Sequence, residues 1–488
     1  MKVLILGNGF DIAHGLPTQY KDFLNFADSV LLMYYEENPH RSINSISIEG
    51  YENHLDRWID DKPAITEPAI IHIKERLRSL FQKRNVSPLE CSNPDNPVYK
   101  VHVEPILDKF YSYLKYNVWY KYIAKIYATN QACGQNWIDF ESEISTIIQA
   151  IDEEHTSLTQ DVQNDLFRLL EKNPHGAGRA KIDIFIKAAI EAYRGYKMGM
   201  ISDFRERLFS DLEKLILALE IYLVDFVETL DIQSLSEITN IRPDLIISFN
   251  YTKTYERLYL KDEHSYKVCH IHGVCRELQE LQDKNNDKSH SGYSGYNSSY
   301  SSNYSSNYKN RDNNMVLGID EYLLENQQTQ KTDFSIFKKF VQRIRNHNNT
   351  NYISWYNEIE QNFKTEHRGN SQVYIYGHSL DVTDKDILKR FIDSPYTEVR
   401  IYAHSKGTEG ELISHLLRYI KEETVIRKAS MNPPMLEFKV TAEKTPTLPA
   451  HSAHLARPPK PLTSSTPTTP PEHITEIVDT HTHIGVPT

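Results

Sequence analysis

The chain has 488 residues, of which 39% are hydrophobic and 25% charged, and its formal net charge is −11. This composition is ordinary for a soluble globular protein, and no apolar run reaches the roughly 18 residues that a membrane-spanning helix needs. The negative charge argues against a general binder of nucleic-acid backbones, which needs clustered lysines and arginines. Only four cysteines, and no apolar segment of signal-peptide length at the start, predict a cytoplasmic protein without a disulfide framework.

The first residues have the pattern of a nucleotide-binding α/β unit. The apolar residues 3–6 predict a buried strand, a glycine turn follows, and a helix is expected around residues 20–26. Gly7 and Gly9 would let backbone amides approach a phosphate or ribose, although a tight turn without a ligand is the alternative. The turn is not a standard dinucleotide fingerprint, because Ile12 stands where the third glycine belongs.

A mostly helical region follows and extends to about residue 239. No element is predicted for residues 36–101, which are irregular and polar. Residues 203–230 carry leucine, isoleucine and phenylalanine at steps of three and four. This periodicity predicts a long helix with one apolar face.

The α/β pattern then resumes. Strands are predicted at residues 245–249, 267–271, 373–376 and 399–403, and helices at residues 333–345, 384–392 and 410–422. Strands that alternate with helices indicate a mostly parallel sheet with helices on both faces. Ligands of such sheets bind beyond the carboxyl ends of the strands.

Three of the predicted strands end in polar motifs, "FNYT", "HIHG" and "GHSL". A single asparagine at a strand end is usually a cap, and a single histidine usually satisfies a neighbouring backbone group. At one sheet edge, however, Asn250 would supply a hydrogen-bonding amide and His272 an imidazole that can act as a general base near neutral pH. His270 and His272 are expected on one face of their strand.

Two motifs invite metal hypotheses. "CHIHGVC" contains Cys269, His270, His272 and Cys275, but a strand sends Cys269 and His270 to opposite faces and no second ligand pair follows, so no zinc site is expected. "DTHTH", residues 479–483, is similar to the first strand of metal-dependent amidohydrolase barrels. Such a barrel would need roughly 250 further residues, so we regard this likeness as accidental or as a relic.

Two stretches are expected outside the folded unit. Residues 289–314 consist almost entirely of Ser, Tyr, Asn and Gly and predict a disordered loop, with self-association as the alternative. Residues 441–488 are rich in Pro, Thr and Ser and predict a tail.

Six motifs in order carry a family resemblance: "LILGNGFDIAHGLPT", "NWIDFESEI", "LIISFNYTKTYERLY", "HIHG", "VLGIDEY" and "VYIYGHSLDVTDKDIL". Together they resemble the bacteriophage abortive-infection AbiH family, from Met1 to about Glu422. The resemblance implies a role in defence against phage.

A more distant resemblance suggests a chemistry. "GNGFDIAHGLP" is similar, length for length, to the sirtuin pattern GAG-x-S-x-x-x-GIP, and the later strand-end Asn, His-Gly and Gly-x-Ser-Leu follow in the sirtuin order. This implies diphosphate contacts for residues 7–10, contacts to the nicotinamide-side ribose or attacking water for Asn250, a general base at His272, and adenosine contacts for Gly377 and Ser379. The nucleotide-binding set is then Gly7, Asn8, Gly9, Phe10, Asp11, Gly15, Thr18, Gly377, Ser379 and Asp384.

Two positions depart from the sirtuin pattern. Asp11 stands where sirtuins have a small hydroxyl residue, and Thr252 stands where they have an acidic one. A carboxylate beside a diphosphate is repulsive by about 1 kcal/mol at 4 Å even in water. Either Asp11 points away from the diphosphate, or the ligand differs from NAD.

We therefore expect a Rossmann-like, sirtuin-like α/β core from residues 1–30 and 240–425, with a large helical insertion at residues 31–239. The leading hypothesis is an antiphage effector that hydrolyses the nicotinamide glycosidic bond of NAD, without a metal and with a homo-oligomer or a defence-system protein as candidate partner. The alternatives are a nucleotide-binding sensor or regulatory subunit without turnover, and a metal-dependent nuclease that uses Asp11, Asp381 and Asp384.

Overall fold

The computed structural model describes most of the chain. The described residues are 1–35, 67–88, 99–103, 105–154, 177–194, 201–260, 268–276, 313–320, 334–366 and 369–441. They belong to one compact unit, Met1–Glu443. Nearly all of the predicted Tyr/Ser/Asn-rich loop and C-terminal tail lies outside the described residues.

A six-stranded sheet, parallel throughout, forms one half of this unit. Its strands are β1 (Lys2–Leu6), β4 (Leu245–Ser248), β5 (Val268–His270), β6 (Ser371–Tyr376), β7 (Thr397–Ala403) and β8 (Leu436–Val440). They lie in the order β5-β4-β1-β6-β7-β8, which is the 3-2-1-4-5-6 order of the Rossmann fold. The predicted α/β class with a parallel sheet is confirmed.

The strand order reverses between β1 and β6. Val3 of β1 pairs with Leu245 on one side and with Val373 on the other. Residues Val3 to Leu6 are almost fully buried, because both faces of a central parallel strand are covered. A crevice outside the carboxyl ends of these two strands is where ligands bind in this class of sheet.

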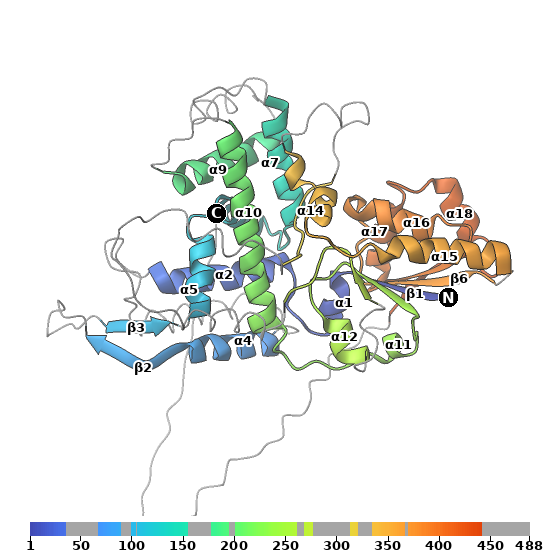
Figure 1. The fold of residues 1–488 in the computed structure, drawn as a ribbon, viewed down its shortest axis with the longest axis horizontal. Coiled ribbons are helices and arrows are strands. Elements are labelled where there is room, and N and C mark those ends of the chain that lie inside the picture. Colours follow the sequence, from blue (N-terminus) through green and yellow to red (C-terminus); the bar gives the residue numbers. More distant parts are fainter. Residues whose placement is uncertain are drawn as a thin grey trace, which may run out of the picture. The chain divides into compact units, whose positions relative to one another are not determined.

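Helices cover the sheet on both sides (Figure 1). One face packs through Val3, Val373 and Val399 against α15 (Asn351–Glu366), α16 (Lys385–Ile392), α17 (Lys406–Leu416) and α18 (Glu422–Ala429). The opposite face packs through Leu4 and Ile246 against the short helices α1 (Asn8–Ala13), α11 (Ser236–Thr239) and α12 (Thr254–Tyr259).

The other half of the unit is mostly helical and has its own hydrophobic core (Figure 1). Its helices are α2 (Tyr20–Tyr35), α4 (Glu67–Leu80), α5 (Pro105–Leu114), α6 (Val118–Ala132), α7 (Phe140–Glu154), α9 (Ala177–Ala192) and α10 (Ile201–Tyr222). The helix predicted over residues 203–230 is confirmed as α10 followed by a π-helical turn, Leu223–Val227. None of the helices among the described residues has the length and apolarity to cross a membrane.

Some elements differ from the sequence expectations. The first helix, α1, begins directly after Gly7, ahead of the predicted helix at 20–26. Two antiparallel strands, β2 (Phe81–Pro88) and β3 (Tyr99–Val103), lie where no element was predicted. The helix expected at 333–345 is a 3₁₀ turn, Ser335–Phe337, followed by α14 (Lys339–Arg345). The edge strand β8 was not predicted, although its short run "LEFKV" has the alternation of apolar and charged residues that is typical of a half-buried strand.

Candidate functional site

A cavity of about 540 Å³ lies beyond the carboxyl ends of β1 and β6, which is the size of a small-molecule site. We call it the cleft. Turns of the sheet line one side, and residues from α2, α10 and the segment before α7 line the other. The predicted site residues that line it are Gly7, Asn8, Gly9, Asp11, Thr18, Asn250, His272, Gly377, Ser379 and Asp384.

Two predicted site residues do not line the cleft. Phe10 is buried in the core beneath the sheet, where its ring lies 4.4 Å from that of His14. Gly15 has a left-handed backbone and nothing near the position of a Cβ atom. Helix α1 begins at Asn8, so its apolar side chain at Phe10 turns into the core and cannot contact a diphosphate in the cleft. For Phe10 the expected ligand contact is therefore not supported.

The glycines of the first turn pack against the turn that follows β6. The Gly9 amide donates a 2.7 Å hydrogen bond to the Gly377 carbonyl, and the Gly7 amide donates to the Tyr376 carbonyl at 3.1 Å. A Cβ on Gly9 would lie 2.8 Å from Gly377 Cα. The space in which a ligand was expected to approach the backbone of Gly7 and Gly9 is thus filled by the turn that follows β6. Close packing of the two turns is enough to require glycine at both positions, with or without a ligand.

Asn8 and Thr18 close the outer side of the turn. The Thr18 hydroxyl donates to Asn8 Oδ1 at 2.6 Å, and Asn8 Nδ2 donates to the Thr18 carbonyl at 3.3 Å. This reciprocal pair ties the start of α1 to the start of the segment before α2 and fixes one wall of the cleft.

Asp11 is a buried carboxylate on the cleft wall, exposed by only 1%. Its Oδ2 accepts a 2.6 Å hydrogen bond from Thr252, whose hydroxyl in turn accepts from Thr254 at 3.1 Å. Burial raises the pKa of Asp11 to about 6, although the hydrogen bonds from Thr252, Thr254 and Asn250 oppose the rise. Its Oδ1 is buried and has no hydrogen-bond partner among the described residues.

Asn250 follows β4 and is also buried. Its backbone amide donates to the Ser248 hydroxyl at 3.2 Å, and its carbonyl lies 3.2 Å from His270 Nδ1. His270 Nε2 lies 2.7 Å from Glu256, so His270 links the Asn250 backbone to Glu256. The side-chain Oδ1 of Asn250 is a second buried acceptor that lacks a partner in the described part of the chain.

His272 does not share a strand face with His270 as expected. Strand β5 ends at His270, and His272 lies in the turn after it, which directs it into the cleft while His270 contacts Glu256. The turn is held by a 2.8 Å hydrogen bond from the Val316 amide to the His272 carbonyl. Burial lowers the pKa of His272, and the charge of Lys339 lowers it further, so the ring is neutral at pH 7.

Asp384 lies behind His272 and joins several charged groups. Its Oδ1 is 3.0 Å from His272 Nε2, without the alignment of a full hydrogen bond, and 3.3 Å from Lys339 Nζ. Its Oδ2 is 3.5 Å from His378 Nε2. Burial alone would raise the pKa of Asp384, but Lys339 and the two histidines hold it well below its usual value. Asp384 is therefore ionised and faces both imidazoles.

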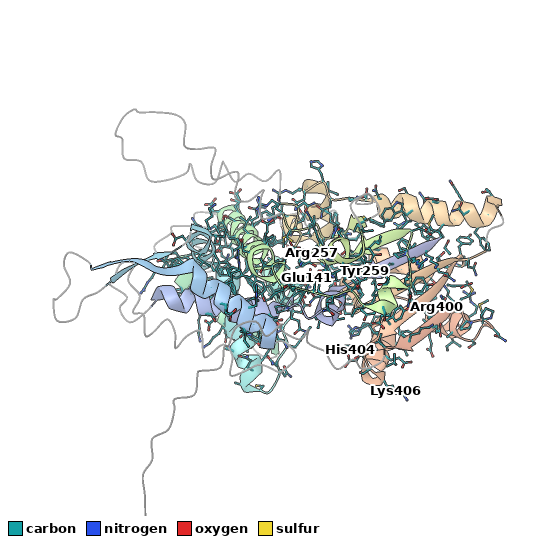
Figure 2. All side chains as sticks on the ribbon, turned by 90° about the horizontal axis from the view of Figure 1, so that it is seen from below. Glu141, Arg257, Tyr259, Arg400, His404 and Lys406 are labelled. Carbon is teal, nitrogen blue, oxygen red and sulfur yellow. The ribbon has the colours of Figure 1, made fainter. Side chains whose placement is uncertain are left out.

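Lys339 connects this group to the helical half. Its ammonium is buried and lies 2.6 Å from Glu141 Oε2 at the start of α7, and Glu141 lies where the helices meet the sheet (Figure 2). Burial raises the pKa of Glu141. Burial would lower the pKa of Lys339, but Asp384 and Glu141 raise it. We call Glu141, Lys339, Asp384 and His272 the charge chain.

Three of these neighbours were not predicted as site residues. Glu141 lies in "NWIDFESEI" and His378 in "GHSL", both of which were quoted as family motifs without a role for these residues. His378 accepts a 3.0 Å hydrogen bond from the Leu380 amide on Nδ1, so a neutral ring carries its proton on Nε2, toward Asp384. Nothing in the sequence indicated that Lys339 is a site residue, because a single lysine on a helix is ordinarily exposed.

The carboxylates of the nuclease hypothesis have separate surroundings. Asp11 accepts a hydrogen bond from Thr252, and Asp384 accepts one from Lys339. Asp381 accepts a hydrogen bond from the Thr383 amide and lies 3.8 Å from Arg418. Within the described ranges, no group of three or more His, Cys, Asp or Glu side chains could hold a metal ion. The two cysteines of "CHIHGVC" also have different neighbours, Asn349 for Cys269 and Glu228 for Cys275.

The fold and the cleft define a doubly wound α/β protein with a polar site at the reversal of strand order. The family model described as "Bacteriophage abortive infection AbiH" matches residues 3–403, and the chain belongs to this family. The predicted membership is confirmed, and with it a role in phage abortive infection. The match ends with β7, so α17, α18 and β8 follow it. Neither the curated proteins nor the solved structures give a match.

Proposed function

We propose that the protein is an abortive-infection effector that hydrolyses the nicotinamide glycosidic bond of NAD in the cleft. One observation carries this proposal: Asp11, Asn250 and His272, which follow three adjacent strands, converge as buried polar groups on one cavity at the strand-order reversal. Buried polar atoms without partners are costly in a fold, so unpaired oxygens on Asp11 and Asn250 favour a ligand that supplies donors.

A ribose supplies such donors. The hydroxyls of a nucleotide ribose are commonly bound by a carboxylate in Rossmann-type sites, and Asp11 and Asn250 both line the cleft and each carry a buried Oδ1 without a hydrogen-bond partner among the described residues. This assigns Asp11 to the ribose, where its charge is favourable, and removes the repulsion expected beside a diphosphate. It also supports the sirtuin-like hypothesis, because Asp11 and Thr252, the two departures, are hydrogen-bonded to each other.

The chemistry needs a base and an oriented water. A water oxygen forms a bond to C1′ of the ribose as the bond from C1′ to the nicotinamide nitrogen breaks, and the bonding electron pair neutralises the pyridinium ring. The proton of the water passes to His272. Since Nε2 faces the ionised Asp384, the neutral ring holds its proton there and offers Nδ1 as the basic nitrogen.

Charge in the cleft favours the transition state. Glycosidic cleavage builds positive charge on the sugar as the leaving group departs. The carboxylate of Asp11, ionised above about pH 6, would stabilise that charge. Asn250 would orient the ribose or the water, and Asp384 would position His272. The products are nicotinamide, ADP-ribose and one proton.

The test is release of nicotinamide from NAD by purified protein, with and without Mg²⁺, and in phage-infected cells, since effectors of this kind are expected to be inactive until triggered. His272→Gln should lower the rate by about 100-fold to 10,000-fold. His404→Gln is the matched control, because His404 is exposed and does not line the cleft. NAD that is bound without being consumed, in cells and in vitro, would indicate a sensor. Loss of nucleic acid that depends on Mg²⁺ would indicate a nuclease.

A further inference from the structure

Trp137 is an exposed tryptophan on the lining of the cleft. Its side chain is 69% exposed, whereas Trp119 is fully buried and Trp355 packs against the sheet core. A tryptophan buries more apolar area than almost any other residue when it finds a partner. Its exposure beside a cavity therefore indicates a surface that a ligand covers.

The segment around Trp137 is attached to the helical half on both sides of this residue. Asn130 Nδ2 donates to the Trp137 carbonyl at 3.4 Å, and the Tyr127 hydroxyl donates to Asn136 Oδ1 at 2.7 Å. The next residues, Ile138 and Phe140, are buried in the helical core. These anchors on both sides leave the indole at the cleft mouth, and such pre-organisation lowers the entropy lost on binding.

A cation lies on the same helical side of the cleft. Lys21 lines the cleft from the first turn of α2, next to Tyr20, whose ring stacks on Phe140 at 4.2 Å. In the described part of the chain no ion pair of Lys21 is found. Arg418, the other strong cation on the lining, has Asp381 at 3.8 Å. Lys21 is thus the cation best able to take an anionic group.

We propose that Trp137 stacks on the base of a nucleotide bound in the cleft and that Lys21 binds its phosphate. The inference deepens the proposed function and rests on it only in requiring a nucleotide ligand, not turnover. A planar base fits a rigid indole face, and stacking tolerates any base because each has a π-face. The helical half then selects the ligand, while the sheet turns hold its ribose.

The test compares two probes that differ only in the base, AMP and ribose 5-phosphate. Binding is measured by equilibrium dialysis with the full chain and two variants. Trp137→Ala should weaken AMP binding by about 5-fold to 150-fold, the range for loss of one stacked base, and leave ribose 5-phosphate unchanged. Lys21→Gln should weaken both probes. Trp137 is exposed, so its replacement should not affect folding, and an unchanged melting temperature checks this.

Tryptophan fluorescence gives a second readout. AMP or NAD should quench emission excited at wavelengths selective for indole in the wild type and in Trp355→Phe, and quenching should disappear in Trp137→Phe. Unchanged AMP affinity in Trp137→Ala, quenching that persists in Trp137→Phe, or wild-type protein that binds neither AMP nor NAD overturns the inference. Protein that binds AMP through Trp137 but never consumes NAD refutes only the hydrolysis. Protein that consumes NAD with an unchanged KM in Trp137→Ala refutes only the stacking.

Discussion

Asp11 Oδ2 accepts a 2.6 Å hydrogen bond from the Thr252 hydroxyl, which joins helix α1 to the turn after β4. Taken singly, each residue breaks the pattern that suggested NAD as the ligand. Under the sirtuin-like hypothesis, they place one carboxyl and one hydroxyl group at the two positions where sirtuins have a hydroxyl and a carboxyl group, in exchanged order. In this protein the hydrogen bond holds the carboxyl group on α1 against the hydroxyl group of Thr252.

Replacing Asp11 should raise stability and lower activity. Burial raises its pKa from 3.8 to about 6, so the folded state binds the proton more tightly than the unfolded chain does. The free energy of unfolding consequently falls as the pH rises from about 4 to 6, and ionisation costs up to about 3 kcal/mol at neutral pH. Asp11→Asn should recover part of this as a higher melting temperature at pH 7. Asp386→Asn, at a half-exposed carboxylate, should change it little, and a lower melting temperature for Asp11→Asn contradicts the argument.

The pH dependence of NAD hydrolysis should follow Asp11 and not His272. The pKa of His272 is lowered by burial and by Lys339. The imidazole therefore remains neutral to a lower pH than an ordinary histidine does. Asp11 takes up a proton near pH 6 and loses the charge that stabilises the sugar cation. Nicotinamide release should fall as the pH drops through about 6, and the residual activity of Asp11→Asn should lack this step. If nicotinamide release by Asp11→Asn still falls at the same pH, the titration belongs to another group.

Lys339 should be needed for both folding and the state of His272. Lys339→Met leaves Glu141 and Asp384 buried without their cation, and removal of one partner from such a group typically costs about 3–5 kcal/mol. Urea unfolding at pH 7 should show this loss. The pKa of His272 should rise, because the repulsion of Lys339 is gone, and NMR titration of the imidazole measures it.

The control for Lys339 is Lys385→Met. Lys385 lies 3.1 Å from Asp320, but both side chains are more than 30% exposed, and such pairs contribute about 0–1 kcal/mol. Equal losses in the two variants would show that the charge chain has no special part in stability.

Local pattern and strand order together explain what could be predicted from the sequence. Asn250 and His272 each follow an apolar run, and parallel strands bring such positions to one edge. The partners of the charge chain could not be found this way, because Glu141 and Lys339 lie on helices outside the strand ends and meet only through tertiary packing. The burial of Phe10 in the core was not predicted, because a helix begins sooner than the glycine turn suggested.

Removal of residues 444–488 should leave the fold intact. The last described contact of the unit is the hydrogen bond from the Thr441 amide to the Ala403 carbonyl, 2.9 Å, which continues the pairing of β8 with β7. The residues beyond are rich in Pro, Thr and Ser and are unsuited to a core. A chain that ends at Glu443 should melt within a degree or so of the full chain by calorimetry, a difference of well under about 1 kcal/mol. A large drop would place part of this segment in the folded unit.

Methyl groups added at the two facing turns should destabilise the protein even without a ligand. Gly377 has φ of 68°, and a Cβ there would lie 2.1 Å from the Phe10 amide nitrogen. A Cβ on Gly9 would lie 2.8 Å from Gly377 Cα. Neither contact can relax by a side-chain rotation, because the neighbouring atoms are backbone. We expect Gly9→Ala and Gly377→Ala to lower the free energy of unfolding by about 1–3 kcal/mol, with the larger loss in Gly377→Ala.

Gly410→Ala is the control: no atom lies within 4 Å of its Cβ position in α17, so it should stabilise by about 0.5–1 kcal/mol. Urea unfolding measures all three. A Gly9→Ala variant that unfolds like the wild type but no longer binds AMP would instead assign this glycine to close approach of the ligand.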